Sequence, residues 1–163
     1  MHIQPVQPES LTQISALAQR SKAHWGYSAE FMAQCQGELT YSVAQLQDPL
    51  AHFFAATIEC RPVGFYVLVG LDEQRVELEA LFVDPAYFGR GLGKRLWQHA
   101  VELGCALGYK SMLIHSDPFA EPFYLHMGAK RIGQRPSASI PGRQLPLLEM
   151  DLAPPVTKTK EDP

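Results

Sequence analysis

The chain has 163 residues and a net charge of -3; 46% of its residues are hydrophobic and 19% are charged. This balance favours one globular domain with a real core and excludes wholesale disorder. No apolar run approaches the roughly 18 residues that a membrane span needs, so we expect no membrane partner. The first ten residues lack the basic-then-apolar pattern of a secretory signal, and we expect a cytoplasmic protein. We expect the domain to cover residues 1–152 and residues 153–163, polar and Pro-rich, to be a disordered tail.

The cysteines and the net charge limit the possible partners. Cys35, Cys60 and Cys105 lie far apart, with no CxxC pair and no Cys/His spacing typical of a metal site. We therefore expect no metal and no disulfide framework, and three buried thiols in a reducing cytoplasm. The negative net charge predicts no nucleic-acid partner.

The charges are unevenly distributed along the chain. Residues 1–74 contain three basic and seven acidic side chains, whereas residues 75–143 contain nine basic and six acidic ones. A basic central third would attract a small anion, but chance spacing of surface charges explains the pattern equally well.

The first half of the chain predicts helices followed by strands. Apolar residues at helical spacing predict a helix over residues 9–24, and Ser28 and Ser42 are suited to cap two short helices, the second ended by Asp48-Pro49. Residues 52–60, 63–70 and 75–83 are rich in aromatic and β-branched residues and predict consecutive antiparallel strands. We place the intervening turns at Arg61-Pro62 and at residues 70–74.

The second half predicts alternating strands and helices. The spacing predicts a long helix over residues 91–107, which Gly108 ends, then a short strand over 111–115 and a helix over 118–127 that begins at a proline. Residues 129–135 and 145–152 predict two closing strands, joined by a loop rich in Pro, Ser and Gly. The order of elements indicates an α+β fold.

A glycine-rich turn between a strand and the long helix is the most informative segment. It reads Val-Asp-Pro-Ala-Tyr-Phe-Gly-Arg-Gly-Leu-Gly-Lys over residues 83–94, with Gly89, Gly91 and Gly93 at alternate positions. Glycines allow unusual backbone dihedrals, and the free N–H groups of a helix start bind phosphate. With the cations of Arg90, Lys94 and Arg95 beside it, the turn predicts a site for a pyrophosphate.

Two common phosphate-binding motifs do not fit this turn. A Walker A loop needs GxxxxGK[ST], but the segment is one residue too short, and Arg95 stands where Ser or Thr is required. A dinucleotide fingerprint needs GxGxxG within parallel βαβ units, but Lys94 occupies the third glycine position and the turn follows an antiparallel meander.

The remaining pattern resembles the GCN5-related N-acetyltransferase (GNAT) superfamily. Its acetyl-coenzyme A loop, [Q/R]xxGx[G/A], is matched by Gly91 and Gly93, while Phe88 replaces the Gln or Arg and keeps its backbone N–H. A second block over residues 117–129, Asp-Pro-Phe-Ala-Glu-Pro-Phe-Tyr-Leu-His-Met-Gly-Ala, resembles the family's NxxAxxFYxxxGF. Here Asp117 replaces the Asn and Ala129 the final Phe. The resemblance covers residues 1 to about 152.

This resemblance implies the fold and the cofactor site. The fold would be a mixed, mostly antiparallel central sheet of about seven strands flanked by helices, in which a splayed parallel pair, residues 76–83 and 111–115, admits acetyl-coenzyme A. The backbone of residues 81–83 would pair with the pantetheine arm, and the N–H groups of residues 88–94 would hold the pyrophosphate. The cofactor-binding residues implied are Leu81, Phe82, Val83, Phe88, Gly89, Arg90, Gly91, Leu92, Gly93, Lys94, Asp117, Ala120 and Phe123.

The second block also implies catalytic roles. Tyr124 matches the family tyrosine that donates a proton to the departing thiolate, and a phenol with a pKa near 10 suits that task. A buried tyrosine at the edge of the core is the alternative. Asp117 would hydrogen-bond the pantetheine as the family Asn does, or would cap the following helix, or both.

The general base has two candidate positions. Glu77 and Glu79 lie two residues apart on one strand and so point to one face, where partial burial would raise their pKa values towards neutrality. Family members often place a glutamate near here, and we favour Glu79, which is nearer the strand's end. A solvent-exposed face is the alternative for both carboxylates. His115 at the end of its strand is a rival base.

The acceptor pocket is expected to involve the N-terminal helices. His24, Trp25 and Tyr27 cluster aromatic rings with a titratable group in the turn between the first two helices, although ordinary packing explains Trp25 equally well. Arg143 in the Pro-Gly-Arg loop would meet an acidic group of the acceptor, or would be a surface arginine in a mobile loop. We count His115 among the residues lining this pocket.

These residues predict an acetyl-coenzyme A-dependent N-acetyltransferase that acts on a primary amine of a small molecule or peptide by direct attack on the thioester. A non-catalytic acyl-coenzyme A binder or sensor on the same fold is the alternative. A nucleotide-binding module is the third hypothesis. Exposed closing strands often form dimers in this superfamily, which implies a homodimer as one possible assembly.

Overall fold

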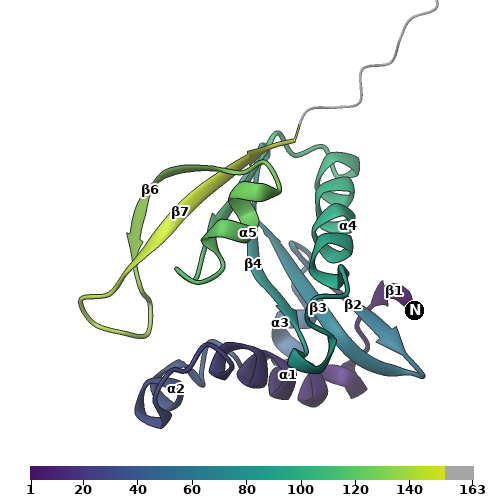
Figure 1. The fold of residues 1–163 in the computed structure, drawn as a ribbon. Helices are drawn as coiled ribbons and strands as arrows, with labels where there is room; N and C mark the ends of the chain where they lie inside the picture. Colours follow the sequence, from purple (N-terminus) through teal and green to yellow (C-terminus); the bar gives the residue numbers. More distant parts are fainter. Residues whose placement is uncertain (153–163) are drawn as a thin grey trace, which may run out of the picture.

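A computed structural model describes residues 1–152 as a seven-stranded sheet with helices on both faces (Figure 1). The expected tail, residues 153–163, lies outside the described residues. The elements in chain order are β1 (His2–Pro5), η1 (Pro8–Ser10), α1 (Leu11–Ala23), α2 (Ala29–Cys35), α3 (Val43–Gln47), β2 (Ala51–Ile58), β3 (Arg61–Gly70), β4 (Arg75–Val83), η2 (Pro85–Tyr87), α4 (Leu92–Ala106), β5 (Ser111–His115), α5 (Glu121–His126), β6 (Lys130–Pro136) and β7 (Gln144–Asp151).

The predicted fold class is confirmed. The strand order is β1-β2-β3-β4-β5-β7-β6, and every neighbouring pair is antiparallel except β4 and β5, which are parallel. The edge strand β1 was not among the segments that the sequence predicted, because four residues ending in a proline carry too little pattern. The β6–β7 ribbon extends away from the rest of the sheet (Figure 1).

The parallel pair splays as predicted. Pairing between β4 and β5 runs from Arg75 opposite Ser111 to Leu78 opposite Ile114 and goes no further. Strand β4 continues to Val83, paired only with β3 over its last residues. One edge of residues 79–83 is therefore open to a ligand.

A β-bulge at Glu79 interrupts β4 at the point where the splay begins. Opposite β3, Leu68 pairs with Leu78 and the preceding Val67 pairs with Ala80, so Glu79 is the extra residue. Leu78 packs into the core on one face of the sheet and Ala80 into the core on the other. No glycine or proline marks this bulge in the sequence.

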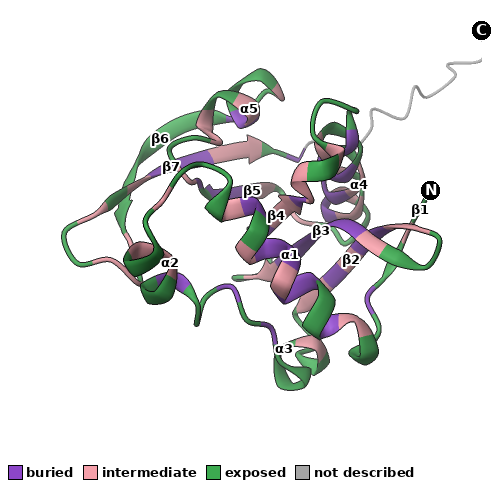
Figure 2. Ribbon diagram, turned by 60° about the horizontal axis from the view of Figure 1, so that its bottom comes forward, coloured by how far each residue is buried: buried purple, intermediate pink, exposed green. Residues whose placement is uncertain are grey.

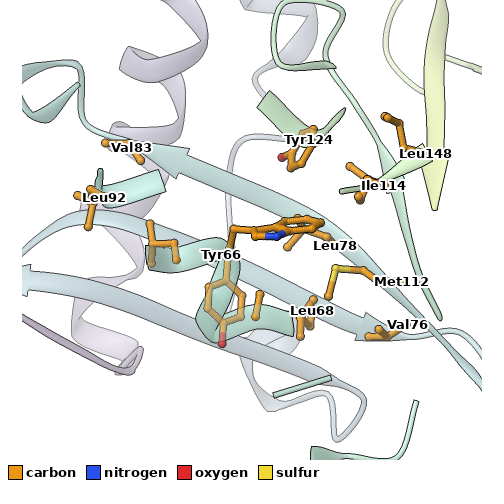
Figure 3. Close-up of a cluster of buried hydrophobic side chains, with 14 of the residues drawn as sticks. Tyr66, Leu68, Val76, Leu78, Val83, Leu92, Met112, Ile114, Tyr124 and Leu148 are labelled. Atoms are coloured by element: carbon orange, nitrogen blue, oxygen red, sulfur yellow. The ribbon is translucent and has the colours of Figure 1, made fainter. Parts of the chain in front are cut away.

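Two hydrophobic cores cover the two faces of the sheet. The core beneath α4 and α5 contains large buried side chains such as Tyr66, Leu96 and Met112, and it also includes Tyr124, as Figure 3 shows. The core beneath α1 contains Ile14, Leu17 and residues of β2 and β3. Figure 2 shows how the buried residues of α1 and the central strands face each other, while β6 is exposed throughout. The central strands that carry the cleft are thus packed from both sides.

Three local predictions need correction. The turn before β3 is formed by Glu59 and Cys60, both at positive φ, and Arg61 and Pro62 already belong to the strand. Residues 118–120 form a turn, so α5 begins at Glu121, with Pro122 rather than Pro118 in its first helical turn. The cysteines are not all buried, because Cys60 is exposed and Cys105 is partly exposed.

The predicted caps of the short helices are confirmed. The hydroxyl oxygen of Ser28 accepts a hydrogen bond from the N–H of Phe31, and Ser42 forms a capping box with Gln45. These caps fix the ends of α2 and α3, and with them the segment that joins the two helices above the cleft.

Candidate active site

A cleft of about 660 Å³ opens where β4 and β5 separate. Its walls come from both sides of the sheet: the glycine turn and α5 at one end, and the segment between α2 and α3 with the β6–β7 ribbon at the other. The lining residues used below are Lys22, Trp25, Glu38, Leu39, Tyr41, Gln45, Glu77, Glu79, Leu81, Phe82, Val83, Phe88, Gly89, Gly91, Leu92, Gly93, Lys94, His115, Asp117, Phe119, Ala120, Phe123, Tyr124, Pro136, Ala138 and Leu145.

The glycine turn has the geometry of an anion site. Gly89 has φ of +75° and Gly91, the N-cap of α4, has φ of +74°, which is a left-handed conformation that glycine adopts without strain. No backbone hydrogen bond within residues 1–152 uses the N–H groups of Gly89 or Gly91. The N–H of Phe88 already donates to the carbonyl oxygen of Pro85 at 3.2 Å, so the expected donor at this position is occupied. Its ring lines the cleft instead.

The cleft fits a phosphorylated, extended ligand such as coenzyme A. Free N–H groups at the start of a fifteen-residue helix favour a diphosphate, and Lys94 lines the same end of the cleft. Leu81, Phe82 and Val83 line the adjoining wall, where the strand edge is open. Arg90 is exposed and stacks its guanidinium over Tyr87, 5.1 Å from the ring centroid, and is not among the cleft-lining residues.

Tyr124 lies in α5, where it is part of the hydrophobic core and also lines the cleft. It is 6% exposed and packs against Trp97 and Phe123, with ring centroids 5.6 and 5.2 Å away. Its hydroxyl makes no hydrogen bond to any residue of the described chain. Burial, and after it the charge of Asp117, raises the pKa of Tyr124 above that of an ordinary phenol, so the group stays protonated at neutral pH.

Glu77 and Glu79, the two carboxylates of β4, line the wall of the cleft that this strand forms. Glu79 is exposed to solvent inside the cleft, where the walls still remove part of its hydration. This partial burial, and after it the charge of Glu77, raises the pKa of Glu79. His115 at the end of β5 has its Nδ1 atom 3.6 Å from a carboxylate oxygen of Glu77. All three predicted acid–base residues therefore share this wall.

Asp117 lies at the centre of a polar cluster with Lys22, Tyr27 and Arg143. Its carboxylate accepts hydrogen bonds from Lys22 Nζ at 3.1 Å, the Tyr27 hydroxyl at 2.8 Å and the Phe119 N–H at 2.9 Å. Arg143 Nη2 lies 3.6 Å away. Burial alone would raise the pKa of Asp117, but these donors outweigh it and lower the pKa. Asp117 does not cap α5, whose N-cap is Ala120; it caps the preceding turn.

The predicted acceptor residues separate into two groups. Trp25 and His115 line the cleft, whereas His24, Tyr27 and Arg143 do not. Tyr27 donates to Asp117, and burial, then this hydrogen bond, raises its pKa to about 12. Arg143 donates to the Tyr27 hydroxyl at 2.7 Å and lies over the rings of Tyr27 and Phe31. Arg143 is thus held by the polar cluster and is not a mobile surface residue.

An aromatic bridge of Phe88, His24, Trp25 and Phe119 crosses the mouth of the cleft. Successive ring centroids lie 4.9, 6.5 and 5.2 Å apart, and Trp25 and Phe119 are stacked. The bridge connects the glycine turn to the segment before α5 through the α1–α2 turn. Its outer rings remain exposed: Trp25 by 41% and Phe119 by 51%. Large exposed aromatic rings at a cleft mouth are typical of a ligand-contacting surface.

Sequence reasoning missed much of the other end of the cleft. Glu38, Leu39, Tyr41 and Gln45 come from the segment between α2 and α3 and the helix that follows. Pro136, Ala138 and Leu145 come from the β6–β7 ribbon. The sequence did contain one signal for this end of the cleft: the predicted cap at Ser42 marks the start of α3, and Tyr41 directly precedes it. Nothing in the sequence indicated that the ribbon folds back over this end.

Two features are absent from residues 1–152. The His, Cys, Asp and Glu side chains of this region form no group of three or more that could hold a metal ion. In the same region, no helix combines the length and the apolar character that crossing a bilayer requires.

The sequence of this chain is similar to those of known acetyltransferases. The model of the acetyltransferase (GNAT) family matches residues 15–129. A peptidyl-lysine N-acetyltransferase, YjaB, of Salmonella typhimurium strain LT2 is 33% identical over 115 residues, which cover 71% of this chain and 74% of that protein.

Solved structures show the same fold. The PaiA N-acetyltransferase of Thermoplasma acidophilum in complex with coenzyme A has a TM-score of 0.74 at 19% identity, covering 92% of this chain and 98% of that one. A GCN5-related N-acetyltransferase from Rhodopseudomonas palustris has a TM-score of 0.75 at 22% identity, covering 93% and 95%. With a family match over most of the domain and the expected splayed sheet in place, this chain belongs to the GNAT family of acetyltransferases.

Proposed function

We propose that this acetyltransferase uses acetyl-coenzyme A to acetylate a primary amine of a small molecule or a peptide. The observation that carries the proposal is that one cleft contains free backbone donors at a helix start, the unpartnered hydroxyl of Tyr124 and the carboxylates of Glu77 and Glu79. The similarity to a peptidyl-lysine N-acetyltransferase supports an amine as the acceptor.

The glycine turn would hold the diphosphate of the cofactor, and the open edge of residues 81–83 would pair with its pantetheine arm. Ala120 and Phe123 line the adjoining wall. Acetyl-coenzyme A supplies a thioester carbonyl that a neutral amine attacks. The carboxylate of Asp117 already accepts from Lys22, Tyr27 and Phe119, so we assign it to positioning the cleft wall rather than to binding the pantetheine.

Glu79 would accept the proton that the amine loses, directly or through a water molecule. Its raised pKa makes its carboxylate a stronger base than an ordinary glutamate. Glu77 and His115, 3.6 Å apart, would pass the proton on to solvent. Because only the deprotonated Glu79 acts as a base, we expect activity to rise as the pH passes upward through its raised pKa.

Tyr124 would donate a proton to the departing thiolate. Its raised pKa keeps the hydroxyl protonated throughout the neutral range, and no protein group of residues 1–152 competes for it. A positioned proton donor of this kind contributes roughly 10²–10⁴ to a rate.

Release of free thiol from acetyl-coenzyme A, measured with a panel of amines, tests the proposal. Release that depends on the amine would support it. Binding of coenzyme A without thiol release from any amine would instead indicate a non-catalytic acyl-coenzyme A binder. A rise in melting temperature with ATP or NAD, and none with coenzyme A, would contradict the proposal and indicate a nucleotide-binding module.

A further inference from the structure

The end of the cleft away from the glycine turn carries three carboxylates, those of Glu38, Glu77 and Glu79, which we call the acidic end. They come from two elements, because Glu38 lies in the segment between α2 and α3 and the other two lie in β4. Within residues 1–152, no Lys or Arg nitrogen lies within 4.0 Å of any of them, and Glu77 has His115 at 3.6 Å.

The cations around the cleft are engaged elsewhere. Lys22 lines the cleft, but its Nζ atom lies 3.1 Å from the carboxylate of Asp117. Arg143 lies 3.6 Å from the same carboxylate and donates to Tyr27. Lys94 belongs to the glycine turn at the opposite end. The acidic end is therefore left without a compensating positive charge from the described chain.

Tyr41 supplies an independent observation at this end. It is 7% exposed, with its ring packed against Phe53 and Phe65, and it lines the cleft. Its hydroxyl has no hydrogen-bond partner among residues 1–152. Burial, and after it the charges of Glu79 and Glu38, raises the pKa of Tyr41, and both carboxylates line the same cleft as Tyr41. Among residues 1–152, the only fully buried side-chain nitrogen or oxygen without a hydrogen-bond partner is Oε2 of Glu121, so the Tyr41 hydroxyl is reached from the cleft. A hydroxyl that lacks a protein partner there is available to a ligand or to water.

The shape of the acidic end favours an extended organic cation over a metal ion. Its carboxylates do not converge, since residues 1–152 contain no group of three potential metal ligands. Glu38 is held at the far side by a hydrogen bond from the Ser139 hydroxyl in the β6–β7 loop. One reacting amine needs the Glu77–Glu79 wall alone, which leaves Glu38 for a second group.

Building on the proposed function, we propose that the acceptor carries two positive charges. Its reacting amine lies at Glu77 and Glu79, and its distal ammonium group is bound by the carboxylate of Glu38 together with the hydroxyl of Tyr41. The substrate class is thus a diaminoalkane or a longer amine with a second cationic nitrogen. An ammonium group donates several charge-assisted hydrogen bonds, which are stronger than those of a neutral hydroxyl.

A matched series of acceptors tests this proposal. Each member has the same reacting amine and chain, and the distal group is methyl, hydroxyl, ammonium or carboxylate; the set is repeated for chains from propane to hexane. Binding to the complex of the protein with coenzyme A is measured by calorimetry, and turnover is measured by thiol release. At the best chain length, we expect the diamine to bind about tenfold or more tightly than the amino alcohol, and the amino acid to bind weakest.

Three variants test which residues cause the preference for the diamine over the amino alcohol. Glu38→Gln should reduce the ratio of diamine to amino-alcohol affinity to within about threefold, since the neutral amide loses the charge-assisted bond. Tyr41→Phe keeps the ring packing and should reduce the ratio less. Glu30→Gln, an exposed change on α2 outside the cleft, should leave the ratio as it is.

Equal binding of the diamine and the amino alcohol at every chain length would overturn the proposal, as would a preference that Glu38→Gln leaves intact. Selective binding of the diamine without thiol release would support the second-charge site while contradicting the proposed transfer reaction. Thiol release without a preference for the diamine would support the transfer reaction and contradict the second-charge site. A preference that weakens as salt concentration rises would support the ionic contact.

Discussion

The two ends of the cleft are built from different parts of the polypeptide. At the proposed cofactor end the free donors are backbone N–H groups of one continuous segment, from Gly89 to the start of α4, set by two glycines at positive φ. At the acceptor end the groups are side chains from separate segments: Glu38 and Tyr41 before α3, Glu77 and Glu79 in β4, and Ala138 in the β6–β7 loop. A backbone site tolerates changes of side chain, whereas a side-chain site changes with every substitution.

From this contrast we infer which part of the enzyme sets its specificity. The diphosphate and pantetheine are common to every acyl-coenzyme A, so a backbone cradle suffices to bind them. The acceptor end must distinguish one amine from another, and we propose that it does so with charges and hydroxyls placed on segments that can vary independently. Substitutions at the two ends should therefore have separable effects, and those of the catalytic groups should be the greatest.

The largest effect is expected from Tyr124→Phe, at the junction of the two ends. Loss of the hydroxyl should lower kcat by roughly 10²–10⁴ because the thiolate then leaves without a positioned proton donor. The affinity for coenzyme A should change little, since the ring packing is kept. Steady-state kinetics and calorimetry check both. Tyr109→Phe, which does not line the cleft, is the control; an unchanged kcat in Tyr124→Phe would remove the tyrosine from the mechanism.

Glu79→Gln should lower kcat by about 10²-fold at neutral pH. In the wild-type protein, kcat/KM should rise with pH as Glu79 loses its proton, at a pH above the ordinary range for a glutamate because its pKa is raised. The variant should lack this rise. Rates measured across the pH range against Glu102→Gln, an exposed change on α4, give the comparison. An identical pH profile in both variants would assign the proton to another base.

Gly91→Val should weaken coenzyme A binding by about tenfold, since a left-handed conformation costs a branched residue roughly 1–2 kcal/mol. A Cβ atom at this position meets nothing within 4 Å, so the cost is one of backbone conformation and not of a clash. Gly133→Val in the exposed strand β6 also meets nothing, and its φ is not positive, so it should bind normally. Equal affinities for the two variants, measured by calorimetry, would show that the turn does not hold the cofactor.

Asp117→Asn should lower the free energy of unfolding by about 1–3 kcal/mol at neutral pH, because Lys22 and Arg143 lose their charged partner. The folded-state pKa of Asp117 is lowered, so its contribution is complete at neutral pH and is lost as the pH falls towards that pKa. The wild type and the variant should therefore converge in acid. Urea unfolding at neutral and acid pH, with the exposed Asp151→Asn as reference, measures this. A constant difference across pH would indicate that the charge is irrelevant.

The smallest effect concerns the aromatic bridge. Trp25 is exposed and lines the cleft, whereas Trp97 is buried in the core. Addition of coenzyme A should therefore change the tryptophan fluorescence of the wild type, and the change should be absent from Trp25→Phe. A signal that persists in this variant would come from Trp97 and would place Trp25 away from the bound cofactor.

The sheet, the long helix and the glycine turn could be predicted from the sequence because each depends on signals within one short segment: alternating apolar residues, two serine caps and alternate glycines before a helix. Tyr124, Glu77 and Glu79 were predicted as site residues; the structure places all three along one cleft, and their catalytic roles stay predictions. We placed one turn at Arg61-Pro62 because a proline usually marks a break, whereas Pro62 lies at the start of β3, before the pairing with β4 begins at Gly64.

The acceptor end and the role of Asp117 depend on contacts between segments that are distant in the sequence. The bulge at Glu79, the fold of the β6–β7 loop over Glu38 and the approach of Lys22 to Asp117 all join residues far apart in the chain. Such contacts follow from how packed elements meet, and no local pattern encodes them. The family could therefore be predicted from the sequence, whereas the carboxylates that we propose to select the acceptor come together only when the elements are packed.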